Sequence, residues 1–312
     1  MTAAGGTGFR LLRLDVAPAP EAPLPATQPL PGRSALSAVA ELLVPAGGPI
    51  FAGHFPGRPL LPGIAHLAMV CQVLEELAAR GILGGEAHGN TAIVEVRKFR
   101  LRREIVPGDR IELRVEGRDE AGAESGGFRF DLRRQPAAGQ PGEIASEGTV
   151  GTGIGGAKPP AAGPIGRPDL APGGPYRPVA DLVPHAPPAR LLTAVLAAGA
   201  GGILCAGSIP ADHPLAAGGE APGFLAIELG AQAAAAFEAM ARQPGGRPRI
   251  GYLVGVRDAH LPARLPTGRT LRVTAVPAGG AAALAIYDVQ VAEDGAAEPL
   301  AAGTISTFLA EA

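Results

Sequence analysis

The 312 residues are 46% hydrophobic and 18% charged, a composition typical of globular proteins, and the length favours two domains. The formal net charge of −2 gives no general reason to expect binding to nucleic acid or to a membrane. No apolar run reaches the roughly 18 residues of a membrane span, and the N-terminus lacks the order of a signal peptide, so we expect a cytoplasmic protein.

The first part of the chain alternates strand-like stretches with a single apolar helix. Residues 1–32 form an N-terminal arm with one strand-like stretch (9–16) and a proline-rich tether. A first domain is expected over 33–153. Its apolar helix ends near Arg80, and its strands have a period of two residues. We expect these strands over residues 37–44, 94–103, 110–115, 128–132 and 144–150.

The stretch before this helix reads Phe-Ala-Gly-His-Phe-Pro-Gly-Arg-Pro-Leu-Leu-Pro-Gly, from Phe51 to Gly63. Proline is tolerated at the start of a helix, where its missing N–H leaves no bond unmade. The first free N–H groups of such a helix can hold a carbonyl oxygen. A histidine beside that position is the layout of an enzyme that acts on acyl thioesters.

This stretch resembles the signature of the 3-hydroxyacyl-ACP dehydratases of the FabA/FabZ class, roughly His-Phe-Pro-x-x-Pro-x-x-Pro-Gly. Every motif residue is present between His54 and Gly63. The resemblance implies a hot-dog fold, in which an antiparallel sheet wraps around a central helix. The family pattern then places a carboxylate at position 68 and a glutamine at position 72; here Gln72 is present, but position 68 is alanine.

The same pattern recurs 160 residues later, after a Gly/Pro-rich linker over 154–176. In this second domain, 177–312, Pro222-Gly223 corresponds to Pro62-Gly63, and Glu228 corresponds to Ala68. We therefore predict an α+β tandem double hot-dog, with two antiparallel sheets that join at their edges. The first half resembles FabZ and the ApeI-like dehydratases, and the second half resembles the ApeP-like proteins of aryl-polyene clusters.

In FabA/FabZ-type enzymes the histidine and the carboxylate come from neighbouring subunits, so the resemblance implies one composite site. His54 and Glu228 would be the catalytic pair, and a helix N-terminus at Gly63 or Gly223 would bind the thioester oxygen. Phe55 and Pro62 would contribute to substrate binding. The sequence leaves open whether the pair divides the base and acid roles, or whether the histidine shuttles the proton while the glutamate holds the water.

The second possible site would combine Ala68 with His213, the nearest histidine of the second half, and we expect it to be vestigial. His66, His88, His185 and His260 are expected to be packed or solvated histidines. Lys98, Arg100 and Arg102 lie on one face of a strand, which suits either a solvated face or a docking patch for an acidic carrier protein.

The sequence thus predicts a 3-hydroxyacyl-[acyl-carrier-protein] dehydratase that forms trans-2-enoyl thioesters in fatty-acid, polyketide or polyene-type biosynthesis. Its partner would be an acyl carrier protein, and pairing of two such chains as a homodimer is left open. No metal site and no cofactor are implied, because the phosphopantetheine arm arrives with the substrate. The alternatives are a hot-dog acyl thioesterase and a non-catalytic subunit that binds acyl chains or a partner dehydratase. Cys71 and Cys205 are expected to be buried thiols.

Overall fold

The computed structural model describes residues 8–18, 36–83, 91–118, 126–135, 142–153, 171–172, 177–241 and 249–311. The tether over 19–32, nearly all of the linker and His88 lie outside these residues. The first half contains β1 (Arg10–Pro18), β2 (Leu36–Leu43), η1 (Pro49–Phe51), α1 (Ala65–Ala79), β3 (Ile93–Leu101), β4 (Arg110–Arg118), β5 (Gly126–Gln135) and β6 (Glu143–Thr152). The second half contains β7 (Ala171–Pro172), η3 (Val179–Asp181), β8 (Leu192–Gly199), β9 (Gly202–Gly207), β10 (Glu220–Pro222), α2 (Leu225–Ala241), β11 (Arg249–His260), β12 (Arg264–Pro266), β13 (Leu271–Ala281), β14 (Leu284–Glu293) and β15 (Ala301–Glu311).

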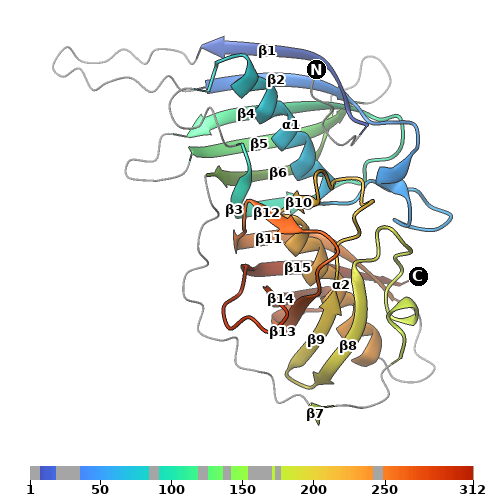
Figure 1. The fold of residues 1–312 in the computed structure, drawn as a ribbon. Helices are drawn as coiled ribbons and strands as arrows, with labels where there is room; N and C mark the ends of the chain where they lie inside the picture. The colour runs from blue at the N-terminus through green and yellow to red at the C-terminus, as the bar shows by residue number, and fades with distance from the viewer. Residues whose placement is uncertain are drawn as a thin grey trace.

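One antiparallel sheet of 13 strands runs through both halves, in the order β1-β2-β4-β5-β6-β3-β11-β15-β14-β13-β9-β8-β7 (Figure 1). The first six strands belong to the first half and the other seven to the second. The strand-like stretch of the N-terminal arm is β1, which pairs with β2 and extends the sheet. Two short strands, β10 and β12, form a separate pair.

The two halves join where β3 pairs with β11, and the register of this pairing shows the duplication. Arg100 lies opposite Gly255, and Glu95 lies opposite His260. Subtracting 160 from the numbers of the second half turns 255 into 95 and 260 into 100. The first pair then joins position 100 to position 95, and the second pair joins position 95 to position 100. The backbone therefore has an approximate two-fold axis at this join, and each half covers an edge strand of its neighbour.

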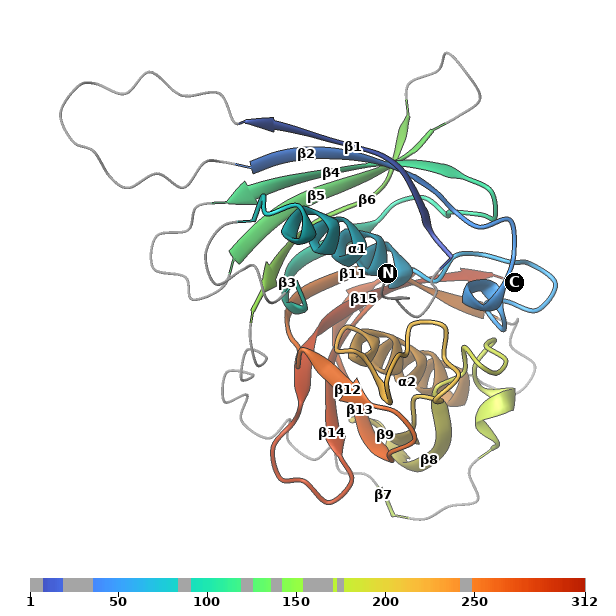
Figure 2. The ribbon, with the colours of Figure 1, turned by 45° about the horizontal axis from the view of Figure 1, so that its top comes forward.

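Each half of the sheet curves around its own helix, as Figure 2 shows for α1 and α2. Both helices are apolar on nearly all sides, which is typical of a helix enclosed by its surroundings. In α1 every side chain from Ala65 to Val70 is buried, and α2 is buried from Leu225 to Gly230. The alternation expected along the strands is also present, for example in β2, where every second residue from Ala38 to Leu42 is buried.

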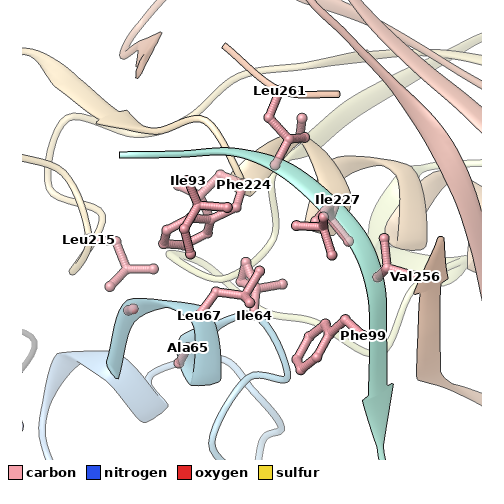
Figure 3. Packing of buried hydrophobic residues seen from close by; sticks show 14 of the residues in the cluster. Ile64, Ala65, Leu67, Ile93, Phe99, Leu215, Phe224, Ile227, Val256 and Leu261 are labelled. Atoms are coloured by element: carbon pink, nitrogen blue, oxygen red, sulfur yellow. The ribbon is translucent and has the colours of Figure 1, made fainter. Parts of the chain in front are cut away.

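The hydrophobic core is continuous across the join. Phe99 of β3 and Val256 of β11 are register partners, and each is 1% exposed. Figure 3 shows them together with residues from the starts of both helices, including Leu67 and Phe224. The predicted double hot-dog is confirmed, and its two units share one core cluster.

Two smaller features complete the description. Both cysteines are free thiols, and burial raises the pKa of each to about 12, so both stay protonated. In the part of the chain that is described, no helix has the length and apolar character needed to cross a membrane.

Candidate active site

A cavity of about 190 Å³ lies between the two halves. Its walls come from the loop that carries His54, the segment after β3, one face of α2, and the neighbouring strands β11 and β15. Along α2 the lining residues are Glu228, Ala231, Ala235 and Glu238, a spacing that places them on one helix face. The cavity therefore follows α2 for about 15 Å, given a rise of about 1.5 Å per residue.

His54 stands in a tight loop that is held by backbone hydrogen bonds. The N–H of Phe55 donates to the carbonyl of Arg58 at 3.1 Å, and the reverse bond measures 3.0 Å. The His54 ring uses Nδ1 to contact the carbonyl oxygen of Leu60 at 3.1 Å. A carbonyl oxygen can only accept, so Nδ1 carries the proton, and Nε2 keeps its lone pair in the neutral ring.

Glu228 lies in the first turn of α2 and is 8% exposed. Its Oε1 accepts a hydrogen bond from Nε2 of Gln232 at 2.9 Å. Gln232 is itself held by backbone groups before β8, because it donates to the carbonyl of Ala189 and accepts from the N–H of Leu191. Gln232 therefore links the carboxyl group of Glu228 to the backbone before β8.

The structure brings His54 and Glu228 together from different halves, and a third residue joins them. His185 lies 3.3 Å from Oε1 of Glu228 through its Nε2, and its ring centroid is 5.2 Å from that of His54. One side-chain ligand atom of each of the three residues lies within 4.8 Å of the other two. Sequence reasoning treated His185 as a packing residue, and its place in the site was missed.

Two histidines and a carboxylate could in principle hold a divalent metal ion, but one feature of the trio does not suit ligation. A ligating histidine ordinarily donates its other ring N–H to an acceptor. Nδ1 of His54 has such an acceptor in Leu60, whereas Nδ1 of His185 is buried without any hydrogen-bond partner. Burial also lowers the pKa of His185 to about 4, with an opposing contribution from Glu228, so this ring is neutral near pH 7. The unpartnered Nδ1 of His185 thus sets the trio apart from an ordinary histidine-ligated metal site.

Among the residues expected at the thioester oxygen, Gly63 lines the cavity and Gly223 does not. No backbone bond within the described residues uses the N–H of Gly63, which precedes α1. The N–H of Gly223 is engaged by the carbonyl of Ala263 at 3.3 Å. Gly223 is therefore unsuited to the role that its sequence position predicts, because its only donor is already used.

Phe55 and Pro62 occupy different sides of the site. The Phe55 ring lines the cavity, stacks on His54 at 4.2 Å and meets the edge of His185 at 4.9 Å. Pro62 lines a smaller hollow beyond His54 and Glu228, which His213 also borders. Phe55 is thus the expected binding residue that faces the cavity.

The proposed second site has neither an acid nor a suitable base. Ala68 is buried in α1 and is not among the residues that line either hollow. Nδ1 of His213 accepts the backbone N–H of Leu215 at 3.2 Å, so the ring proton sits on Nε2. This tautomer is the opposite of that in His54. Burial lowers the pKa of His213 to about 4, which keeps the ring neutral.

His66 also borders the cavity. Its Nδ1 is 2.9 Å from Oγ of Ser146, and burial lowers its pKa to about 3. A neutral, hydrogen-bonded histidine in the wall agrees with the expectation of a satisfied side chain.

The expected docking residues lie on the outer face of the join. Lys98, Arg100 and Arg102 are exposed, and Arg257 of β11 is exposed opposite Lys98. Arg102 forms an ion pair with Glu147, and its side chain reaches the wall of the cavity. The pKa of Glu147 is lowered by its hydrogen bond to Arg102 and by the nearby positive charges. This strip of side chains is a basic surface beside the cavity.

Comparison with known proteins supports the division into two related halves. Residues 32–140 match the ApeI-like family of ApeI dehydratases, and residues 177–312 match the ApeP-like family of ApeP dehydratases. The 3-hydroxyacyl-[acyl-carrier-protein] dehydratase FabZ of Anaeromyxobacter sp. (strain K) is 38% identical over 76 residues, which are 24% of this chain and 49% of that protein. The FabZ of Mannheimia succiniciproducens is 43% identical over 70 residues, 22% of this chain and 45% of that protein. The chain thus spans about half the length of the curated relatives it matches.

Two solved structures share the whole architecture. The dehydratase domain of the polyketide PpsC from Mycobacterium tuberculosis is 14% identical with a TM-score of 0.59, covering 88% of this chain and 94% of that one. A bifunctional dehydratase-cyclase domain in ambruticin biosynthesis is 19% identical with a TM-score of 0.52, covering 90% and 93%. At these identities the likeness establishes the double hot-dog fold alone. The family matches thus identify an ApeI-like dehydratase domain over residues 32–140 and an ApeP-like dehydratase domain over residues 177–312, and the solved structures add the double hot-dog fold that contains both.

Proposed function

We propose that this protein removes water from 3-hydroxyacyl thioesters carried on an acyl carrier protein and releases trans-2-enoyl thioesters. The observation that carries the proposal is the pairing of His54 from one half with Glu228 from the other, across a cavity with space for an acyl chain. The pathway would be fatty-acid, polyketide or polyene-type biosynthesis. The expected cytoplasmic location stays a prediction.

The arrangement of atoms supports a division of roles. Nε2 of His54, the nitrogen with the free lone pair, takes the proton from C2 of the substrate. The negative charge that develops on the thioester oxygen is stabilised by the N–H of Gly63 at the start of α1. Glu228 gives a proton to the C3 hydroxyl as the C3–O bond breaks and water leaves. The proton on His54 then returns to Glu228, which restores both groups.

We infer one working site per chain. His213 would present an Nε2–H where a base needs a lone pair, and Ala68 offers no carboxylate. Both partners of the second pair are therefore unsuited to the reaction.

The domain limits 33–153 and 177–312 likewise remain our proposal for the two units.

The carrier protein would dock on the surface formed by Lys98, Arg100, Arg102 and Arg257. Carrier proteins that are acidic would be attracted by this charge, and Arg102 lies where the surface meets the cavity. Subtracting the offset places Asp258 and His260 at the positions of Lys98 and Arg100. The second half therefore lacks this basic strip, which supports docking on one side only. Assembly of two chains into a homodimer stays a prediction.

The proposal is tested by hydration of a crotonyl thioester, the reverse reaction, followed by loss of the enoyl absorbance. We expect His54→Ala and Glu228→Gln to lower kcat by about 10²- to 10⁴-fold, and His213→Ala to remain within twofold of wild type. Full activity of His54→Ala would refute the proposed site.

Two further results would replace the proposal by its rivals. Release of free thiol from acyl thioesters, without enoyl formation, would indicate a thioesterase. A folded wild-type protein that is inert with both ACP- and CoA-linked substrates, and active only beside a partner dehydratase, would indicate a non-catalytic subunit.

A further inference from the structure

We propose that His185 is a positioning residue for Glu228, which it orients so that one defined oxygen of the carboxyl group delivers the proton. The inference rests on the proposed dehydratase function. It starts from the 3.3 Å contact between Nε2 of His185 and Oε1 of Glu228, in which the two side chains are only 9% and 11% exposed.

Two nitrogen donors face the same carboxyl oxygen. Gln232 donates to Oε1 at 2.9 Å, and His185 approaches Oε1 from the other half of the site. Within the described part of the chain, no hydrogen bond reaches Oε2. In a protonated carboxyl group the oxygen that accepts hydrogen bonds is the carbonyl oxygen, and the other carries the proton. When Glu228 carries the proton that the reaction requires, this arrangement places it on Oε2.

The tautomer of His185 follows from its surroundings. The buried ring is neutral near pH 7 and carries one N–H, while Nδ1 has no partner. A proton on Nδ1 would leave a buried donor unsatisfied and would bring the Nε2 lone pair against a carboxyl oxygen. A proton on Nε2 faces Oε1 of Glu228, and Nδ1 is then a buried acceptor without a partner. This costs less free energy than a buried donor without a partner.

The backbone holds His185 against the loop of His54. The N–H of Ala186 donates to the carbonyl of Gly53 at 3.0 Å, and the ring of His185 meets the edge of Phe55. Ala186 follows His185 and Gly53 precedes His54, so this one hydrogen bond joins the two histidine-bearing segments. Because of this, one rigid junction between the two halves determines the positions of the base and of the group that orients the acid.

The test compares three substitutions in the full chain. In His185→Gln the amide nitrogen lies at the same distance along the side chain as Nε2 and can donate to Glu228. In His185→Asn the amide ends at the level of Nδ1 and cannot reach it, and His185→Ala removes the donor altogether. We expect the glutamine variant to keep kcat within about fivefold of wild type, and the other two to lose about 10²-fold in kcat with KM within threefold.

A matched control is His260, whose Nδ1 is also buried without a partner but which lies outside the cavity. His260→Asn should leave kcat unchanged. Equal losses of kcat in all three His185 variants, in step with equal losses of Tm, would show a purely structural role and overturn the inference. Full activity of His185→Asn would overturn it as well.

A double-mutant cycle provides a measurement that does not depend on how well the glutamine variant folds. Once Glu228→Gln has removed the acid, adding His185→Asn should change the residual rate by less than twofold, because both residues act through the same proton. A further 10²-fold loss would contradict the inference. If Glu228→Gln itself retains full activity, the proposed function fails first, and this distinguishes the two failures.

Discussion

The contact between the two histidine-bearing segments makes Gly53 the most sensitive glycine of the site. Its φ is +78°, and a Cβ built on it would lie 1.9 Å from the carbonyl oxygen of Ala186. Gly57 in the same loop has nearly the same φ, +79°, but nothing lies within 4 Å of its hypothetical Cβ. The pair Gly53→Ala and Gly57→Ala therefore separates the backbone cost from the cost of the contact.

Both substitutions should lower folding stability, but only Gly53→Ala should also displace the residues of the site. Both substitutions place alanine in the left-handed region, which costs about 1–2 kcal/mol of folding stability. Real Cβ contacts essentially never fall below 3.0 Å, so in Gly53→Ala the loop of His54 and the segment of His185 must separate by about 1 Å. The Gly53–Ala186 hydrogen bond would then be lost, at a further cost of about 1 kcal/mol. A misplacement of about 1 Å within a site can lower the rate by about 10²-fold.

The assay is kcat/KM for crotonyl-thioester hydration, measured beside urea unfolding of the same samples. Gly57→Ala should keep kcat/KM within threefold of wild type while losing stability. Gly53→Ala should remain folded and lose about 10²-fold in kcat/KM. If the two variants have equal activity, the junction between the halves does not set the geometry of the site, and the reasoning is wrong.

Three other predictions follow from contacts described above. Gln232→Leu leaves buried backbone groups and a carboxyl oxygen without their partner, so it should lower the free energy of unfolding by at least about 2 kcal/mol. The equivalent Gln72→Leu removes one bond, from Nε2 of Gln72 to the carbonyl of Phe9 at 3.2 Å, and should cost less than about 1.5 kcal/mol; urea unfolding of both variants decides. Between about pH 6.5 and pH 3 the unfolded chain binds a proton at His66 that the folded chain excludes, so the free energy of unfolding decreases as the pH falls. His66→Asn should therefore reduce the slope of this free energy against pH by up to about 1.4 kcal/mol per pH unit, and an unchanged slope in urea titrations would contradict this. Replacing Lys98 and Arg100 together by glutamate should raise KM for the ACP-linked substrate by about tenfold, and this increase should be smaller at high salt. The value of kcat/KM for the CoA-linked substrate should stay within twofold of wild type, and equal effects on both substrates would show that the surface does not bind the carrier.

Much of the fold could be predicted because period and repetition are local properties of the sequence. The two-residue alternation located the strands of the first half, and the offset of 160 residues places four of the five stretches expected in the first domain on β11, β13, β14 and β15. The fifth stretch, 37–44, falls at 197–204, across the turn between β8 and β9, so the offset does not locate these two strands. Strands β7, β10 and β12 were also missed, because each has two or three residues and therefore no period to read. The strand of the N-terminal arm and the strand β2 were both expected, but their pairing was not, because alternation does not identify a neighbour.

The site was predicted in part, through the resemblance. His54 and Glu228 occupy motif positions, and the structure places them together, while their roles remain proposals. His185 lies in a segment that resembles the ApeP-like proteins, but packing was a sufficient explanation for it, because its contacts in the site come from residues about 130 positions earlier in the chain. The only local signal was a histidine among prolines ahead of a buried strand. Gly223 is the opposite case, because the repeat makes it look equivalent to Gly63, whereas in the structure its N–H is bonded to the carbonyl of Ala263 and it does not line the cavity.

The symmetric join between β3 and β11 has a consequence for how such a protein can change over time. In a homodimer of identical units, one gene supplies both copies of every position, so replacing the acidic residue by alanine would remove it from both sites. In this chain the two copies are encoded separately, and Ala68 belongs to only one of the two possible sites. Fusion thus lets the paired backbone stay symmetric while the side chains differ, with His54 and most of the basic surface in one unit and Glu228 and His185 in the other.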